Sequence, residues 1–117
     1  MSAFADPEHE LPPERAAELL AEGGAQVVDV REPYEREAGR IPGTTHIELE
    51  RLASQAESIS RETPVVFYCR VGARSGMAAQ AFRGSGYDAH NMAGGMTAWD
   101  DADLPMEPEG SAYVAAH

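Results

Sequence analysis

Short apolar runs recur along this chain, separated by stretches whose apolar residues have helical spacing. The runs at 25–30 and 64–68 are rich in β-branched or aromatic residues and are bounded by glycine, proline or charged residues. These features are typical of buried strands. Weaker patterns at 45–47 and 87–91 predict two further strands.

Helices are predicted between these strands. The first begins at Pro12-Pro13-Glu14 and ends at Gly23-Gly24, because proline suits the first turn of a helix and glycine suits its end. Further helical segments are expected at 34–38, 48–58, 75–83 and 96–100. In the third of these, one apolar side is predicted from Met77, Ala78, Ala81 and Phe82.

The alternation of strands and helices predicts an α/β fold. Right-handed crossovers place a helix between successive parallel strands, so the sheet should be parallel and covered by helices on both faces. Ligands of such sheets bind beyond the carboxyl ends of the strands. Because residues 29–31 and 69–74 both follow strands, we expect them to be neighbours.

The size and composition indicate one soluble domain. The chain has 117 residues, of which 43% are hydrophobic, and this length is too short for two ordinary cores. We expect the domain at 8–107 and flexible ends at 1–7 and 108–117. Neither a signal peptide nor a membrane-spanning run is visible, so a cytoplasmic location is expected. A monomer is the default expectation.

The charge of the chain restricts its partners. Its formal net charge is −11, from 20 acidic and 9 basic residues. Nucleic acids and anionic membranes repel such a surface, so we expect neither as a partner. All the basic residues are arginine, which fits either a high-salt cytoplasm or a GC-rich genome.

Candidate chemistry centres on the single cysteine, Cys69. One cysteine forms no internal disulfide, and the sequence has no Cys/His cluster with zinc-ligand spacing, so no metal is expected. Lone cysteines usually serve as small buried apolar residues. Here, however, the thiol ends a strand and precedes a helix, and Arg70 and Arg74 are close in sequence. Loop amides, the helix terminus and these charges would favour a thiolate. Alternatively, Gly72 serves only a turn and the arginines are solvated.

Four segments resemble signatures of the rhodanese family. Residues 69–75, Cys-Arg-Val-Gly-Ala-Arg-Ser, resemble its active-site loop, Cys-Arg-x-Gly-x-Arg-Ser. The segments 29–32 and 39–43 resemble its upstream signatures, and 91–99 with Leu104-Pro105 resembles its closing one. The sequence departs from the family pattern at Arg40, where histidine is frequent, and at Thr44-Thr45-His46.

The resemblance spans about 11–105 and implies a five-stranded parallel sheet flanked by helices on both faces. It also implies a sulfurtransferase without a cofactor, which would move a sulfane sulfur from thiosulfate or a persulfide to cyanide or a thiol through a Cys69 persulfide. We assign Arg74 to catalysis beside Cys69, as electrostatic support of the anionic sulfur, and Arg70 to the anionic donor. The predicted binding loop comprises Arg70, Val71, Gly72, Ala73 and Ser75.

Asp29 and Arg31 are interpreted as a buried brace between strand ends in preference to substrate ligands. Trp99 is interpreted as a packing residue. A Cys-His hydrolase is disfavoured, because none of the histidines is placed beside Cys69 by the sequence. These histidines are His9, His46, His90 and His117.

Two alternative functions stay open. One is a sulfur-relay or protein-binding module whose acceptor is another protein. The other is a cysteine phosphatase or arsenate reductase, whose phosphate cradle places five residues between cysteine and arginine. Here four residues separate Cys69 from Arg74, and a shorter ring of amides suits one sulfur atom better than an oxyanion.

Overall fold

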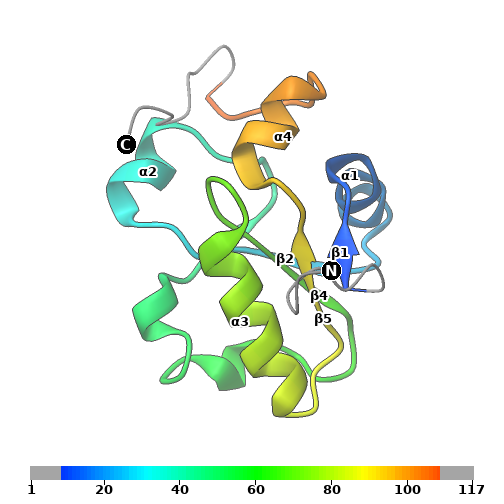
Figure 1. The fold of residues 1–117 in the computed structure, drawn as a ribbon, viewed down its shortest axis with the longest axis vertical. Coiled ribbons are helices and arrows are strands. Elements are labelled where there is room, and N and C mark those ends of the chain that lie inside the picture. Colours follow the sequence, from blue (N-terminus) through cyan, green and yellow to red (C-terminus); the bar gives the residue numbers. More distant parts are fainter. Residues whose placement is uncertain (1–8, 109–117) are drawn as a thin grey trace.

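A computed structural model describes residues 9–108 as a parallel sheet with helices on both faces (Figure 1). The sheet has five strands in the order β1-β5-β4-β2-β3, and every strand pair is parallel. The strands are β1 (Glu10–Leu11), β2 (Gln26–Asp29), β3 (Thr45–His46), β4 (Val65–Tyr68) and β5 (Ala89–Met92). The α/β fold and the parallel sheet predicted from the sequence are confirmed.

Residues 9–108 contain four α-helices, of which the first three each lie between two strands in the sequence and the last follows β5. They are α1 (Pro13–Glu22), α2 (Pro33–Ala38), α3 (Ala73–Gly84) and α4 (Gly95–Asp101). Helix α1 begins with proline in its first turn and ends at Gly23, which has φ of 71°, a left-handed conformation that glycine adopts without steric cost. The sequence-predicted helix boundaries at Pro12-Pro13 and Gly23-Gly24 are therefore confirmed.

Strand β4 lies at the centre of the sheet and is buried on both faces. Val65 and Phe67 face a core with Ala78 and Phe82 of α3. Val66 and Tyr68 face a second core that contains α1 and α4 residues such as Ala16, Met96 and Trp99. Successive strand side chains point to opposite faces. Cys69, two residues after Phe67, therefore points to the same face as Phe67 and belongs to the core under α3.

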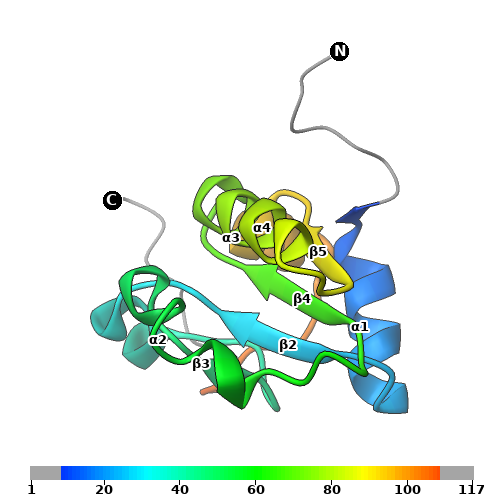
Figure 2. The same ribbon diagram turned by 90° about the horizontal axis from the view of Figure 1, so that it is seen from below.

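Strands β2 and β4 run side by side in the same direction (Figure 2). Val28 pairs with Phe67, and Asp29 pairs with Tyr68. Their carboxyl ends therefore lie at one edge of the sheet, where the loops that lead to α2 and α3 begin. The predicted proximity of 29–31 to the cysteine loop is confirmed, since Val30 N–H donates to the Tyr68 carbonyl at 3.0 Å.

The helix predicted at 48–58 is wrong. This segment contains two 3-10 helices, Leu49–Arg51 and Ala56–Ser58. The hydroxyls of Ser54 and Ser58 donate to carbonyls three residues earlier, at 3.0 and 2.7 Å, and such local bonds compete with a regular α-helix. The segment therefore forms tight turns that leave small alanine side chains facing α3.

Two details near α3 also differ from the prediction. The strand predicted at 87–91 begins later, at Ala89, because Tyr87 N–H still donates to the Phe82 carbonyl at the end of the helix. The predicted apolar side of α3 is only partly buried. Ala78 and Phe82 lie in the core, whereas Met77 is 54% exposed and Ala81 is also exposed. Strand β1, only two residues long, has no individual pattern in the sequence.

The C-terminal part of the described chain is tied to the segment after α2. Arg40 and Glu107 exchange two backbone hydrogen bonds of 2.8 and 2.9 Å, and their side chains form an ion pair. The ends predicted to be flexible, 1–7 and 108–117, lie outside the described residues apart from Pro108. Within residues 9–108, no helix has the length and apolar character needed to cross a bilayer.

Candidate functional site

Cys69 lies directly after β4, and hydrogen-bond donors surround its sulfur. Its side chain is 1% exposed. The N–H of Gly72 lies 3.1 Å from Sγ, the N–H of Ser75 3.5 Å, and the Ser75 hydroxyl 3.3 Å. Donors that converge on one atom stabilise negative charge there. Although the thiol is buried, its surroundings are therefore polar on the side of the loop.

The loop reaches this shape through Gly72, the residue before α3. Gly72 has φ of 101°, a conformation that residues with a Cβ rarely adopt. Its carbonyl accepts the Gly76 N–H at 3.0 Å, so the loop continues directly into the 12-residue helix α3. The sulfur therefore lies at the positive end of the α3 dipole, which also favours an anion.

Residues 70–74 of the loop are more accessible than Cys69. Val71 is 51% exposed, Ala73 is exposed, and Arg70 and Gly72 are half-buried. Of the amides predicted to bind sulfur between Val71 and Ser75, those of Gly72 and Ser75 donate to Sγ. The Ser75 hydroxyl is a further donor, and its side chain is completely buried.

The Arg74 guanidinium binds the carboxylate of Glu35 from α2. Two hydrogen bonds of 2.7 and 3.0 Å join them side by side. The bonds to Glu35 raise the pKa of Arg74, because their effect is larger than that of burial, which lowers it. Burial raises the pKa of Glu35, but Arg74 and the Glu32 amide outweigh it, so the net pKa is lowered. Arg74 therefore joins α3 to α2, and its charge is largely balanced before any substrate binds.

Sequence reasoning missed Glu35. Its Oε1 also accepts the Glu32 N–H at 3.0 Å, which completes a capping box at the start of α2. The pair Glu32 and Glu35 has the spacing of an N-terminal cap. That signal predicts a local helix start and gives no indication of the long-range contact with Arg74.

Asp29 and Arg31 form a buried ion pair. Arg31 Nε and Nη2 donate to the two carboxylate oxygens at 2.9 and 2.8 Å, and Nη2 also donates to the Gly39 carbonyl. Their exposed fractions are 0% and 1%. Burial lowers the pKa of Arg31, but the bond and charge of Asp29 reverse this, so the net pKa is raised. The pair has the geometry of a brace between β2 and the segment after α2, and no side-chain surface remains for a substrate.

Arg36 of α2 contacts the end of β4 on the side where Asp29 lies. Its Nη1 donates to the Thr44 hydroxyl at 2.8 Å and to the Tyr68 hydroxyl at 3.3 Å. Burial, with the nearby Asp29 charge, raises the pKa of Tyr68 to about 12. Tyr68 therefore stays a neutral phenol next to Cys69 in the chain, and it anchors the strand end.

Asn91 of β5 supports the loop from the other side. Its Nδ2 donates to the Gly72 carbonyl at 3.2 Å and lies 3.0 and 3.1 Å from the Glu10 carboxylate oxygens. Gly72 thus receives a bond on its carbonyl while its N–H points at Sγ. Asn91 lies in a segment that resembles a family signature, but a polar residue in a short strand gives no sign of this contact.

Helix α4 starts against the backbone of the cysteine loop. The N–H of Met96 donates to the Cys69 carbonyl at 2.9 Å, and that of Thr97 donates to the Arg70 carbonyl at 3.0 Å. At Gly95 an added Cβ would lie 2.4 Å from the Cys69 carbonyl oxygen. Only glycine permits this approach. Trp99, on the same helix, is 2% exposed and donates to the Pro105 carbonyl, in agreement with its interpretation as a packing residue.

The described histidines make their contacts elsewhere. His46 bonds the Arg31 carbonyl, His90 bonds Asp88, and the rings of His9 and His90 lie 5.7 Å apart. His117 lies outside the described residues. One group of carboxylates, from Glu32, Glu48 and Glu50, gathers within 4.8 Å. This group includes neither histidine nor Cys69 and lies partly in solvent, so it does not extend the site around the sulfur.

Comparison with known proteins gives consistent matches. The family model of the rhodanese-like domain matches residues 12–102. The chain is 42% identical over 76 residues to the uncharacterized protein YqhL of Bacillus subtilis, which covers 64% of this chain and 60% of YqhL. It is 35% identical over 98 residues to the thiosulfate sulfurtransferase GlpE of Pseudomonas putida, which covers 83% of this chain and 88% of GlpE.

A solved structure shares the fold. The crystal structure of a rhodanese-related protein from Thermoplasma volcanium superposes with a TM-score of 0.79 at 24% identity, over 86% of this chain and 99% of that one. This similarity, together with the strand order of the sheet, confirms the five-stranded architecture that the sequence resemblance implied.

We predict that Gly95→Ala destabilises the protein and disturbs the cysteine loop. The new Cβ would overlap the carbonyl groups of Cys69 and Arg70, and φ at this position is +57°, so we expect a loss of at least about 3 kcal/mol in urea unfolding. Gly84→Ala is the control, because nothing lies within 4 Å of its Cβ. Its stability should stay the same or rise by up to about 1 kcal/mol. Equal stability of both variants would contradict the close approach.

We predict a pH-dependent loss of stability in Glu35→Gln. The folded-state pKa of Glu35 lies below its ordinary value of 4.5, so its contribution is present above that pH and is lost as the pH falls through the lowered value. Because Arg74 is partly solvated, we expect a deficit of about 1–3 kcal/mol at pH 7 that shrinks below about pH 4. Urea unfolding at several pH values measures it. Glu18→Gln, in an exposed pair with Arg15, should cause little change, and a deficit independent of pH in Glu35→Gln would argue against this ion pair.

Proposed function

This chain belongs to the rhodanese family, and we propose that it is a sulfurtransferase that carries the transferred sulfur on Cys69 as a persulfide. The observation that carries the proposal is the convergence of the Gly72 and Ser75 donors on Cys69 Sγ. The similarity to a thiosulfate sulfurtransferase over 83% of the chain supports the general activity. The donor and the acceptor are the specific part of the proposal.

In the first half-reaction, the Cys69 thiolate attacks the outer sulfur of thiosulfate or of a small persulfide. A sulfur–sulfur bond to Cys69 forms, the bond within the donor breaks, and its electron pair leaves with sulfite or a thiolate. The negative charge now resides on the outer sulfur of the Cys69 persulfide. The amides of Gly72 and Ser75 and the helix terminus stabilise that charge in the same way as they stabilise the thiolate.

In the second half-reaction, cyanide or a thiolate attacks the outer sulfur. The Cys69 thiolate leaves, and the product is thiocyanate or a new persulfide. Cys69 itself is 1% exposed, whereas the outer sulfur extends about 2.05 Å further from it. We therefore place the transferable atom nearer the loop surface than the cysteine that carries it, which favours its capture by an acceptor.

The arginines have different roles in this proposal. Arg74 acts through position: its bond to Glu35 fixes the first turn of α3, and this turn supplies the Ser75 donors. Its remaining charge adds to the field at the sulfur. Arg70 is half-buried beside the sulfur-bearing residue, and we assign it to the anionic part of the donor.

We also propose that the protein is a cytoplasmic monomer and that it needs no cofactor.

A protein acceptor is a second candidate, favoured by the exposed apolar side chains of this region. Val71 within the loop is 51% exposed, and Tyr34, the neighbour of Glu35 in α2, is 56% exposed. Exposed aromatic and aliphatic groups are frequent at protein interfaces. Turnover that is slow with small thiols and fast with a partner protein would favour relay over small-molecule transfer.

The central test is the intact mass after incubation with thiosulfate. We expect the wild-type protein to gain one sulfur atom and to lose it on addition of cyanide, with release of thiocyanate. Cys69→Ser should gain none, since it lacks the attacking thiolate. If Cys69→Ser still transfers sulfur, the site assignment is wrong.

We also predict that Ser75→Ala slows persulfide formation. The substitution removes the hydroxyl 3.3 Å from Sγ and leaves the Ser75 amide in place. The loss of one donor to an anion should reduce the single-turnover rate with thiosulfate by about tenfold. Ser54→Ala is the matched control, because its hydroxyl donates to the Arg51 carbonyl at the surface. A rate equal to that of Ser54→Ala would contradict a role for the hydroxyl.

A further inference from the structure

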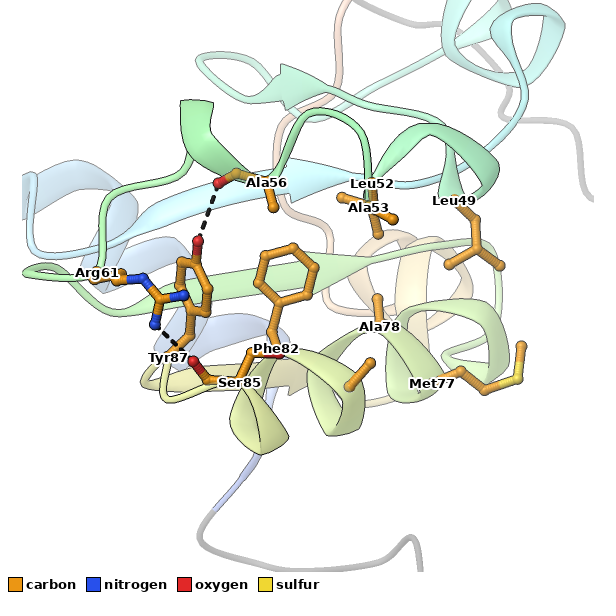
Figure 3. Close-up of a pocket in the computed structure, with 11 residues that line it drawn as sticks. Leu49, Leu52, Ala53, Ala56, Arg61, Met77, Ala78, Phe82, Ser85 and Tyr87 are labelled. Atoms are coloured by element: carbon orange, nitrogen blue, oxygen red, sulfur yellow. Dashed lines mark hydrogen bonds between the residues drawn. The ribbon is translucent and has the colours of Figure 1, made fainter.

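An open pocket lies between α3 and the irregular segment that follows β3, away from the cysteine loop (Figure 3). Its volume is about 560 Å³, within the range of about 300–1,000 Å³ that is usual for small-molecule sites. None of the loop residues 69–75 lines it. Its lining consists of Leu49, Leu52, Ala53, Ala56, Arg61, Met77, Ala78, Ala81, Phe82, Ser85 and Tyr87.

The pocket exists because small side chains face each other across it. Ala53 and Ala56 belong to the turns that replace the predicted helix, and Ala78 and Ala81 belong to α3. The aromatic ring of Phe82 lies between these two walls (Figure 3). Covering an apolar surface of this kind with an apolar ligand removes it from water, which lowers the free energy of the complex.

The two ends of the pocket differ in character. Figure 3 shows Leu49 and Met77 at one end and Arg61 with Tyr87 at the other. Met77 is 54% exposed, so an extended apolar group could continue along it. The Arg61 end, by contrast, offers a positive charge, hydrogen-bond donors and an aromatic ring.

Two contacts hold the Arg61 guanidinium in place and leave some of its N–H groups available to a ligand. Its guanidinium lies 4.3 Å from the centroid of the Tyr87 ring, and Nη1 donates to the Ser85 carbonyl at 2.6 Å. A guanidinium stacked on a ring keeps its remaining N–H groups in the plane, where they match a carboxylate. Within residues 9–108, no carboxylate pairs with Arg61. Six other arginines do pair with carboxylates: Arg15, Arg31, Arg36, Arg40, Arg51 and Arg74.

We propose that this pocket binds a small amphipathic carboxylate, with its apolar body along Leu52 and Phe82 and its carboxylate on Arg61. The charge of the chain, −11 overall, disfavours an anion at most of its surface. Because Arg61 supplies a positive charge at one end of the pocket, the carboxylate of the ligand should lie at that end and its apolar body should point toward the other. This site goes beyond sulfur transfer, and it requires neither Cys69 nor a persulfide.

The test is an NMR titration of the ¹⁵N-labelled full chain with decanoate, below the concentration at which it forms micelles. Decyltrimethylammonium, with an alkyl tail one carbon longer and the opposite charge, is the ligand control. Decanoate should bind at least several-fold more tightly and shift the amides of residues 77–87. Binding should be unchanged in Cys69→Ser, so that a failure of the sulfurtransferase proposal and a failure of this one give different results.

Two pairs of variants separate the head group from the tail. Arg61→Gln should weaken decanoate binding by about three- to tenfold. Arg15→Gln, on α1 at the opposite face of the sheet, should leave it unchanged. Ala81→Leu fills the pocket and should reduce binding at least tenfold. Gln80→Leu adds the same side chain to α3 outside the lining and should have no effect.

Several outcomes would overturn the proposal. These are equal binding of the two detergent-like ligands, unchanged binding in Arg61→Gln and Ala81→Leu, and shifts confined to the cysteine loop. A dimer detected by sedimentation and disrupted by Ala81→Leu would also overturn it, because a second copy would then occupy the pocket. Urea unfolding of each variant identifies any that is not folded.

Discussion

The site depends on one local constraint, the direction in which the peptide N–H groups of the cysteine loop point. Gly72 turns the chain into a left-handed conformation, so that its own N–H and the donors of Ser75 face Cys69 Sγ. Without that turn, Cys69 would be a small buried residue at the end of an apolar strand. With it, the buried thiol has polar contacts on one side and core contacts on the other.

The rest of the fold keeps this loop in place from several directions. Helix α4 donates to the carbonyls of Cys69 and Arg70, and Asn91 of β5 donates to the carbonyl of Gly72. The ion pair between Arg74 and Glu35 holds the first turn of α3 against α2. Because the backbone carbonyls are occupied by these neighbours, the N–H groups stay directed at the sulfur. A site preorganised in this way needs little reorganisation when charge moves between two sulfur atoms.

Local sequence signals were sufficient for the strands β2 and β4, the helices α1 and α3 and the position of Cys69 between them. They failed where short-range bonds compete with a helix, as at Ser54 and Ser58. They also failed where a contact joins distant segments. Glu35 and Asn91 have no pattern that indicates their bonds to Arg74 and Gly72, since these partners are 39 and 19 residues away. Arg74 is part of the loop by its position in the sequence, but its bonds to Glu35 depend on how α2 and α3 pack in three dimensions.

The most direct measurement of the central claim is the amide proton shift of Gly72 and Ser75 during sulfur loading. In a ¹⁵N-labelled sample treated with thiosulfate, these two amides should change more than any others, because the charge they bind moves to the outer sulfur. Cyanide should restore their original positions. If both amides keep their shifts while Cys69 gains a sulfur atom, the loop does not hold the anion, and the proposed basis of sulfur transfer is wrong.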